Sequence, residues 1–236
     1  PDEIVLLHID DHRDMMPPRI GQRLDGRFID YMTEGEIDLL SPKTVTRAIQ
    51  SGAIGRGSIV TPLAWSVSKL HIRHLSCRPS SHTTYRLTRS TCADNLFLRS
   101  NNQIDLHCSE MGWDDLSSAS SYVVTSDVAT WVRDIPKEVP ILLHFDLDYF
   151  NNRFDGSSSW EEEERSHFHN PTWDEQVAML KSLYDGIQHH SLSDRIIDTS
   201  IGISPGFYPA EFWAPMVEHI RKLSPDIDKP ARGKYE

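Results

Sequence analysis

The sequence predicts an α/β fold with a mainly parallel central sheet and helices on both faces of that sheet. Short apolar runs that suit strands alternate along the chain with longer segments that suit helices, as in parallel sheets with helical connections. Two of these runs, residues 4–7 and 141–143, are apolar without alternation, which is typical of strands buried on both faces. Each is followed by carboxylates and imidazoles, and such sheets bind ligands beyond the carboxyl ends of their strands.

The elements of the first half follow from local patterns. After the strand at 4–7, a helix is predicted to begin with Ser41 as its N-cap and Pro42 at its first helical position. The Gly-rich stretch 54–65 predicts a loop that returns to the sheet. Alternating apolar and polar residues predict short strands at 70–75 and 85–87. Residues 122–125 are another strand candidate.

The second half repeats the alternation of strand and helix. Ser126 or Asp127 is expected to cap a short helix before the strand at 141–148. Residues 151–170 are polar and Glu-rich, and a connection of that length is often a lid or partly disordered. The remaining elements are a helix at 171–190, a strand at 196–204, a helix at 210–223 and a loosely held tail at 224–236.

Length and composition suit a single catalytic domain spanning 1–236, long enough to bury a sizeable core. The net charge is −11 and no run of Lys and Arg occurs, so nucleic acid is not an expected partner. The lack of an 18-residue apolar stretch predicts no membrane span. Three cysteines without a C-x-x-C pair argue against a disulfide framework and favour the cytoplasm. The sequence does not predict an oligomeric state.

The two polar clusters after the buried strands share one pattern. Residues 8–14 read His-Ile-Asp-Asp-His-Arg-Asp, and residues 144–149 read His-Phe-Asp-Leu-Asp-Tyr. Alternate side chains of an extended strand share a face. This periodicity groups one set of ligands from each cluster, namely Asp10, His12 and Asp14 from the first and Asp146 and Asp148 from the second.

These five side chains predict a metal centre, because a buried carboxylate is costly unless a partner or a cation compensates it. Oxygen-rich sites with one or two imidazoles suit Mn²⁺, with Fe²⁺, Co²⁺ and Zn²⁺ as weaker alternatives. Carboxylates can bridge, so two ions about 3.5–4 Å apart are expected. His8 and His144 are possible additional ligands. The alternative is a pair of solvated, inert acidic loops.

The first cluster resembles the D-A-H-x-D motif of the arginase and ureohydrolase fold, and the second resembles its S-x-D-x-D motif. Both are more similar to a divergent branch that includes the peptide arginases of ribosomal-peptide biosynthesis (RiPP biosynthesis). The resemblance implies an arginase/deacetylase-like three-layer sandwich and a binuclear manganese centre. It also implies conversion of arginine side chains of a precursor peptide to ornithine, with release of urea. Asp14 would be the catalytic proton carrier.

The chain departs from the family pattern at two places. The family has a further His ligand upstream of the first motif, and here we expect a missing N-terminal segment to carry it, or His8 or His144 to replace it. The family also has a Glu near the last strand that binds the guanidinium, where this chain has Gly202. Substrate recognition is therefore expected to differ from that of arginases acting on free arginine.

Other polar residues are weaker candidates for the site. His167 and His169 in the polar loop are possible proton shuttles, or simply solvated histidines. Glu110 is a possible contact for a cationic substrate. Gly202 and Ser204 follow the last strand and are expected to line the pocket.

Three alternative functions stay open on the sequence. The first is a small-molecule ureohydrolase, and the second is an amidohydrolase or deacetylase of the same fold with a single zinc. The third is a non-catalytic binding module that keeps the motifs as relics. Metal content separates the third from the others, because a relic would bind less than one ion.

Overall fold

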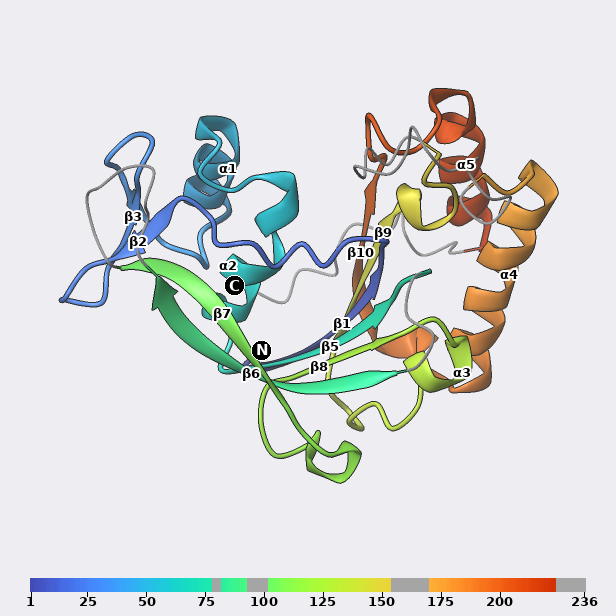
Figure 1. Cartoon of the computed structure of the whole chain (residues 1–236), viewed down its shortest axis with the longest axis horizontal. Helices are drawn as coiled ribbons and strands as arrows, with labels where there is room; N and C mark the ends of the chain where they lie inside the picture. The colour runs from blue at the N-terminus through green and yellow to red at the C-terminus, as the bar shows by residue number, and fades with distance from the viewer. Residues whose placement is uncertain (78–81, 93–101, 154–169, 224–236) are drawn as a thin grey trace, which may run out of the picture. The chain divides into compact units, whose positions relative to one another are not determined.

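The computed structural model describes residues 1–77, 82–92, 102–153 and 170–223. Within these ranges the chain is an α/β protein with a ten-stranded mixed sheet and five α-helices (Figure 1). The strand order is β10-β9-β1-β5-β8-β6-β7-β2-β3-β4. The chain divides into two compact units, each assembled from several stretches of sequence. The first unit comprises 1–4, 12–71 and 84–122, and the second comprises 5–11, 72–83 and 123–236.

The second unit carries most of the strands and helices expected from the apolar runs. Its strands are β1 (Glu3–Ile9), β5 (Lys69–Leu75), β8 (Ser121–Thr125), β9 (Ile141–Asp146) and β10 (Ile196–Gly202), of which β1, β5 and β8 begin within the first unit. Its helices are α3 (Val128–Trp131), α4 (Trp173–His189) and α5 (Trp213–Leu223). Strand β9 pairs in parallel with both β1 and β10.

Side chains that cap the helices explain where two of them begin. Asp127 accepts a hydrogen bond from the backbone N–H of Thr130 at 2.7 Å, which fixes the start of α3. Thr172 and Glu175 form a capping box at the start of α4. Each side chain there accepts a hydrogen bond from the other residue's backbone N–H, so two helix-end donors are satisfied.

The core of the second unit lies between the strands and helices α3, α4 and α5 (Figure 1). Val5, Leu7 and Ile9 from β1 pack into this core together with the odd-numbered residues of β9. Because side chains alternate along a strand, the even-numbered residues of β1 and β9 face away from the helices. His8 and His144 are therefore on the opposite face of the sheet, where they are nevertheless buried.

The first unit is built mainly from antiparallel strands. These are β2 (Ile20–Gln22), β3 (Phe28–Asp30), β4 (Glu36–Ile37), β6 (Thr83–Cys92) and β7 (Gln103–Glu110). Helices α1 (Pro42–Ser51) and α2 (Val60–Ser66) complete it. Its core is a small apolar cluster from β2, β4, β7 and the region around α1, namely Ile20, Ile37, Ala48, Ala53, Ile54 and Ile104.

The prediction of a mainly parallel sheet is confirmed only at the level of the α/β class. The sheet is mixed: β2–β3, β2–β7, β3–β4 and β6–β7 are antiparallel, whereas β1–β9 and β9–β10 are parallel. Strands β2, β3 and β4 have only two or three residues, too few for a strand period to be visible in the sequence. The prediction of a loop at 54–65 is also wrong, since this range contains a 3₁₀ turn at Arg56–Ser58 and all of α2 except its last residue.

Helices on both faces of the sheet are not established by the structure. Within the second unit, α4 contacts both α3 and α5, and all three pack against one apolar face of the strands. The expected tail at 224–236 lies outside the described residues.

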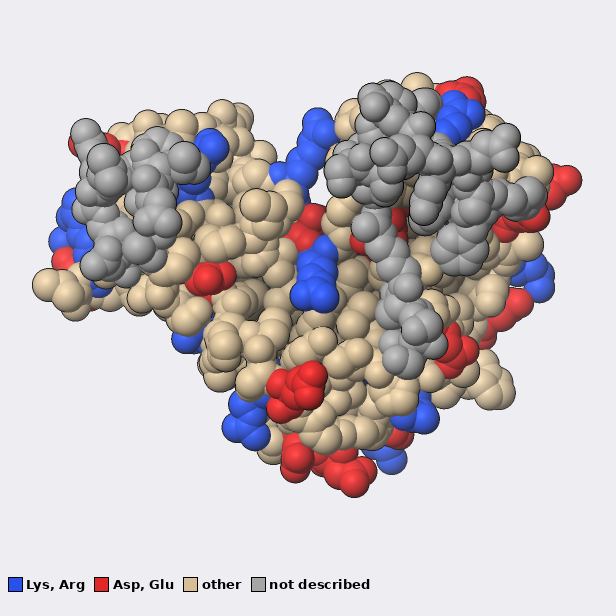
Figure 2. Space-filling model, viewed as in Figure 1, with Lys and Arg blue, Asp and Glu red and all other residues tan. Residues whose placement is uncertain are grey.

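Surface charge and helix hydropathy of the described residues are relevant to nucleic-acid and membrane partners. Lys and Arg side chains on the face shown in Figure 2 are interspersed with Asp and Glu and do not gather into one basic patch. None of the helices in the described ranges is both long enough and apolar enough to cross a membrane.

Candidate metal centre

The candidate site lies at the carboxyl ends of three neighbouring strands of the second unit. The parallel register places His8 of β1 beside His144 of β9, and Asp146 of β9 beside Gly202 of β10. This register brings the two polar sequence clusters to the same edge of the sheet, although they are more than a hundred residues apart.

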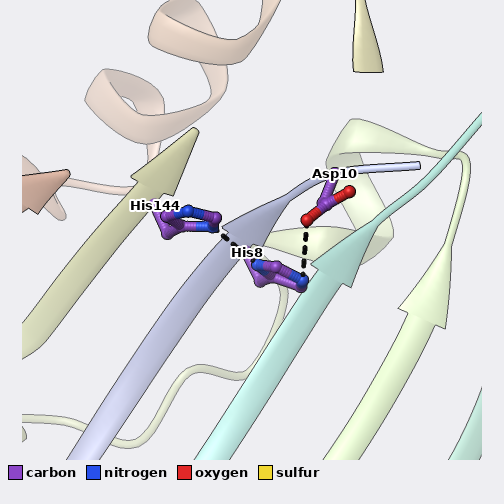
Figure 3. Close-up of side chains that lie close together, drawn as sticks. All are labelled: His8, Asp10 and His144. Atoms are coloured by element: carbon purple, nitrogen blue, oxygen red, sulfur yellow. Dashed lines mark hydrogen bonds and ion pairs between the residues drawn. The ribbon is translucent and has the colours of Figure 1, made fainter. Parts of the chain in front are cut away.

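Three side chains form the centre of the site: His8, Asp10 and His144 (Figure 3). The Nδ1 atoms of His8 and His144 are 2.9 Å apart, so one imidazole donates its proton to the other. His8 lies between the other two, with its Nε2 atom 3.5 Å from Asp10 Oδ2. One potential ligand atom from each residue lies within 4.8 Å of the other two.

Burial sets the protonation of His144. The exposed fraction is 0% for His8 and Asp10, and 8% for His144. Burial lowers the pKa of His144 to about 4, although the nearby Asp148 acts in the opposite direction. A neutral imidazole keeps a lone pair on one ring nitrogen, and that lone pair is what a metal ion needs.

Two further carboxylates lie close to Asp10. A carboxylate oxygen of Asp146 lies within 4.8 Å of one from Asp10, and the same holds for Asp148. Ser204 Oγ contacts Asp146 Oδ1 and is 3.2 Å from Asp148 Oδ2. A hydroxyl has one hydrogen to donate, so Ser204 can satisfy only one of these two carboxylates.

These three acidic groups, of which Asp10 and Asp148 are buried and Asp146 is partly buried, repel one another. Such repulsion disfavours the charged forms unless a cation or protons compensate it. The donor set consists of carboxylate oxygens and imidazole nitrogens from these five residues. These donors suit Mn²⁺, Fe²⁺, Co²⁺ or Zn²⁺, so buried His and Asp groups of this unit can hold a metal ion.

A layer of polar side chains supports the ligands. His74 of β5 donates from Nε2 to the backbone carbonyl of Asp10 at 2.9 Å, which fixes the chain where β1 ends. The backbone N–H of Asp11 donates to Asp148 Oδ1 at 3.2 Å. The carboxylate of Asp11 accepts hydrogen bonds from Ser76 Oγ (3.3 Å) and Asn152 Nδ2 (2.6 Å). Contacts of this kind orient ligands in known metal sites.

The ligands are not arranged on one face of an extended strand, although the alternating pattern predicts that arrangement. Strand β1 ends at Ile9, so Asp10, His12 and Asp14 do not alternate along an extended strand. Asp14 has a left-handed backbone with φ of 51°. Asp148 lies in a short 3₁₀ helix after β9. The positions of Asp10, Asp146 and Asp148 therefore depend on the loops after the strands.

Other predicted site residues have different outcomes. His12, Asp14 and Glu110 belong to the first unit, so their convergence with Asp10 stays a prediction. His167 and His169 lie outside the described residues. Gly202 and Ser204 are at the site: a Cβ atom added to Gly202 would lie 3.2–3.3 Å from the carboxylate atoms of Asp146.

Four residues that support the site are not among those predicted from the sequence. They are the buried side chains Asp11, His74, Ser76 and Asn152. A signal existed for His74, because an imidazole within the strand-like run 70–75 is unusual in a buried strand. Ser76 and Asn152 lie in connections after strands, where no periodicity marks them.

Comparison with known proteins does not identify this chain: no protein-family model matches it, and no curated protein matches it.

Proposed function

We propose that the protein is a metal-dependent hydrolase of the arginase type that acts on arginine side chains of a peptide. The observation that carries this proposal is the clustering of His8, Asp10, His144, Asp146 and Asp148 at the ends of paired parallel strands. The proposal also draws on the resemblance of the two motifs to those of the arginase and ureohydrolase fold. The three-layer arrangement of that fold is itself part of the proposal.

The residues suit two Mn²⁺ ions. Asp10 has a ligand atom within 4.8 Å of one from each of the two imidazoles and from the carboxylates of Asp146 and Asp148, so these residues would hold the ions. Manganese ions held in this way supply an acidified water that can attack at neutral pH. The imidazoles and carboxylates hold the ions, and Ser204 and Gly202 shape the space beside Asp146.

The proposed reaction is hydrolysis of a guanidinium group. Water adds to the guanidinium carbon, and the bond from that carbon to the substrate nitrogen breaks, giving ornithine and urea. The departing amine requires a proton, and Asp14 would take a proton from the attacking water and return it to this amine. Gly202 offers no side chain to bind the guanidinium, so we propose that contacts to a peptide contribute to recognition.

A second candidate function has one observation in its favour. His8, Asp10 and His144 are two imidazoles and one carboxylate, a set that suits a single catalytic zinc with an open position. An amidohydrolase or deacetylase would use such a site. Metal analysis separates the candidates, since the arginase proposal requires two ions per chain and this alternative requires one.

Mass spectrometry tests the proposed reaction directly. The protein is incubated with Mn²⁺ and either free L-arginine or acetyl-Gly-Arg-Gly-amide, followed by a panel of longer arginine peptides. Hydrolysis at the guanidinium carbon removes CN₂H₂, a loss of about 42 Da per site. We expect this loss from a peptide at a much higher kcat/KM than from free arginine. Equal processing of free arginine and every peptide would instead favour a small-molecule ureohydrolase.

A further inference from the structure

Asp11 is a buried carboxylate that the proposed metal centre does not use. In the described part of the second unit, the buried carboxylate side chains are Asp10, Asp11 and Asp148. Asp10 and Asp148 belong to the ligand cluster. Asp11 follows Asp10 directly, and its backbone N–H donates to Asp148 Oδ1. A negative side chain thus lies next to the ligands, where the D-A-H-x-D motif has alanine.

Asn152 adds a second acceptor beside Asp11. Its Nδ2 atom donates to Asp11 Oδ2 at 2.6 Å, a short hydrogen bond between side chains that are 5% and 6% exposed. The other end of the same amide, Oδ1, is buried and has no hydrogen-bond partner among the described residues. A buried acceptor of this kind costs about 1–3 kcal/mol when it is left unsatisfied, so a donor from outside the chain would stabilise it.

The two groups together select a particular class of ligand. The carboxylate of Asp11 and the Oδ1 atom of Asn152 are both acceptors, and a carboxylate brings negative charge. A guanidinium is planar, positively charged and purely a donor, with several N–H groups that can reach two neighbouring acceptors. A neutral urea group has an acceptor oxygen and no charge, so it matches less well.

We infer that Asp11 and Asn152 bind the guanidinium of the substrate arginine, in place of the side chain that Gly202 lacks. This inference rests on the proposed function and adds the residues that determine its specificity. Charge-assisted hydrogen bonds are strongest where water is excluded, and both side chains are buried. Asp11 would therefore act on substrate binding, while the metal ions stay with the neighbouring ligands.

The test compares an arginine peptide with its neutral counterpart. Acetyl-Gly-Arg-Gly-amide is the substrate, and the same peptide with citrulline in place of arginine is the neutral probe. The variant is Asp11→Asn, because its amide oxygen can still accept from Asn152 while the charge is lost. Asp185→Asn is the matched control, since it makes the same change in an exposed residue of α4 that pairs with Lys181.

We expect Asp11→Asn to lower kcat/KM for the arginine peptide about 100-fold, which corresponds to about 2.7 kcal/mol. Binding of the citrulline peptide and the manganese content should change less than about threefold, because neither depends on this charge. Asp185→Asn should leave all three values unchanged. A purely structural role for Asp11 would instead weaken both peptides and the metal together, and that result would overturn the inference.

A second variant and a binding measurement keep the test decisive. If Asp11→Asn does not fold, Asn152→Ala removes the unsatisfied acceptor and should reduce the preference for arginine over citrulline about tenfold. Calorimetry measures binding of both peptides even without turnover. If both Asp11→Asn and Asn152→Ala leave turnover unchanged, only this inference is overturned. A wild-type protein that neither converts arginine nor prefers it over citrulline overturns the proposed function itself.

Discussion

A buried imidazole lies beside a carboxylate near each end of strand β1, and the two arrangements differ in how their charges are balanced. At the start of β1, in the first unit, Glu3 Oε1 is 2.8 Å from His71 Nε2 and 3.1 Å from Lys69 Nζ. The other ring nitrogen of His71 is 2.9 Å from Ser121 Oγ. One carboxylate is thus held by a lysine and an imidazole, and both nitrogens of that imidazole have hydrogen-bond partners.

The arrangement at the far end of β1, in the second unit, brings several carboxylates together. Asp10 lies near Asp146 and Asp148, and the hydroxyl of Ser204, which lies beside both of these, can donate to only one of them. The comparison teaches that a buried histidine beside an acid is not by itself a sign of function. A cluster of carboxylates is better evidence of function, because their mutual repulsion does not stabilise the fold.

Removal of metal should have the largest effect of the changes considered, and it should act on the carboxylate cluster of the second unit only. Dialysis against a chelator should abolish turnover and lower the melting temperature by several degrees, since an ion at 100 times its dissociation constant stabilises the fold by about 2.7 kcal/mol. Adding Mn²⁺ back should restore both. Calorimetric melting with and without chelator provides the measurement, and an unchanged melting temperature would indicate that the cluster binds no ion.

Asp148→Asn should lower kcat by at least about a thousandfold, or about 4 kcal/mol of transition-state stabilisation. The change removes one negative ligand and keeps the volume of the side chain. Manganese content should fall as well, and circular dichroism should show an intact fold. Activity within about tenfold of the wild type would rule out an essential ligand role for Asp148.

Gly202→Ala should have a smaller effect confined to the site. The added Cβ would lie 3.2–3.3 Å from the Asp146 carboxylate, so that carboxylate must shift, and crowding of this kind costs about 1–3 kcal/mol. We expect kcat to fall about tenfold or more. Steady-state kinetics and metal titration measure the effect. A fully active Gly202→Ala enzyme would show that the position of Asp146 is not critical.

Glu3→Gln should have the smallest effect, because it alters only the contacts of Glu3 with His71 and Lys69. The hydrogen bond from His71 lowers the pKa of Glu3 below its usual 4.5, with Lys69 contributing in the same direction. The stabilisation is therefore present above pH 4.5 and is lost as the pH falls through the lowered pKa. Partly exposed pairs contribute about 1 kcal/mol or less. Chemical denaturation at pH 7 and pH 3 should show a larger difference between wild type and Glu3→Gln at the higher pH, with turnover at pH 7 unchanged.

The sequence predicts those helices and strands whose apolar residues recur at a regular spacing. Strand β9 and helices α1 and α4 lie where apolar spacing and capping residues place them. The short antiparallel strands β2 to β4 are missed because two or three residues show no period. The apolar runs predict that the clusters after β1 and β9 belong together, and the parallel register brings His8 beside His144.

The finer geometry of the site depends on contacts that spacing does not reveal. Period-two alternation suggested ligands on one strand face, whereas Asp10 lies just beyond β1 and Asp148 lies in a 3₁₀ helix. Asn152 and Ser76 converge on Asp11 from distant parts of the sequence. Such convergence is set by tertiary packing, and a single sequence contains no signal for it.

The pairing of β1 with β9 also constrains how the protein is made. His8 and His144 lie side by side although they are 136 residues apart in the chain. During synthesis the edge of the apolar strand β1 that pairs with β9 stays unpaired until β9 has left the ribosome. An unpaired apolar strand is prone to aggregate, so production of this protein in a foreign host should respond strongly to chaperone levels and to the rate of translation.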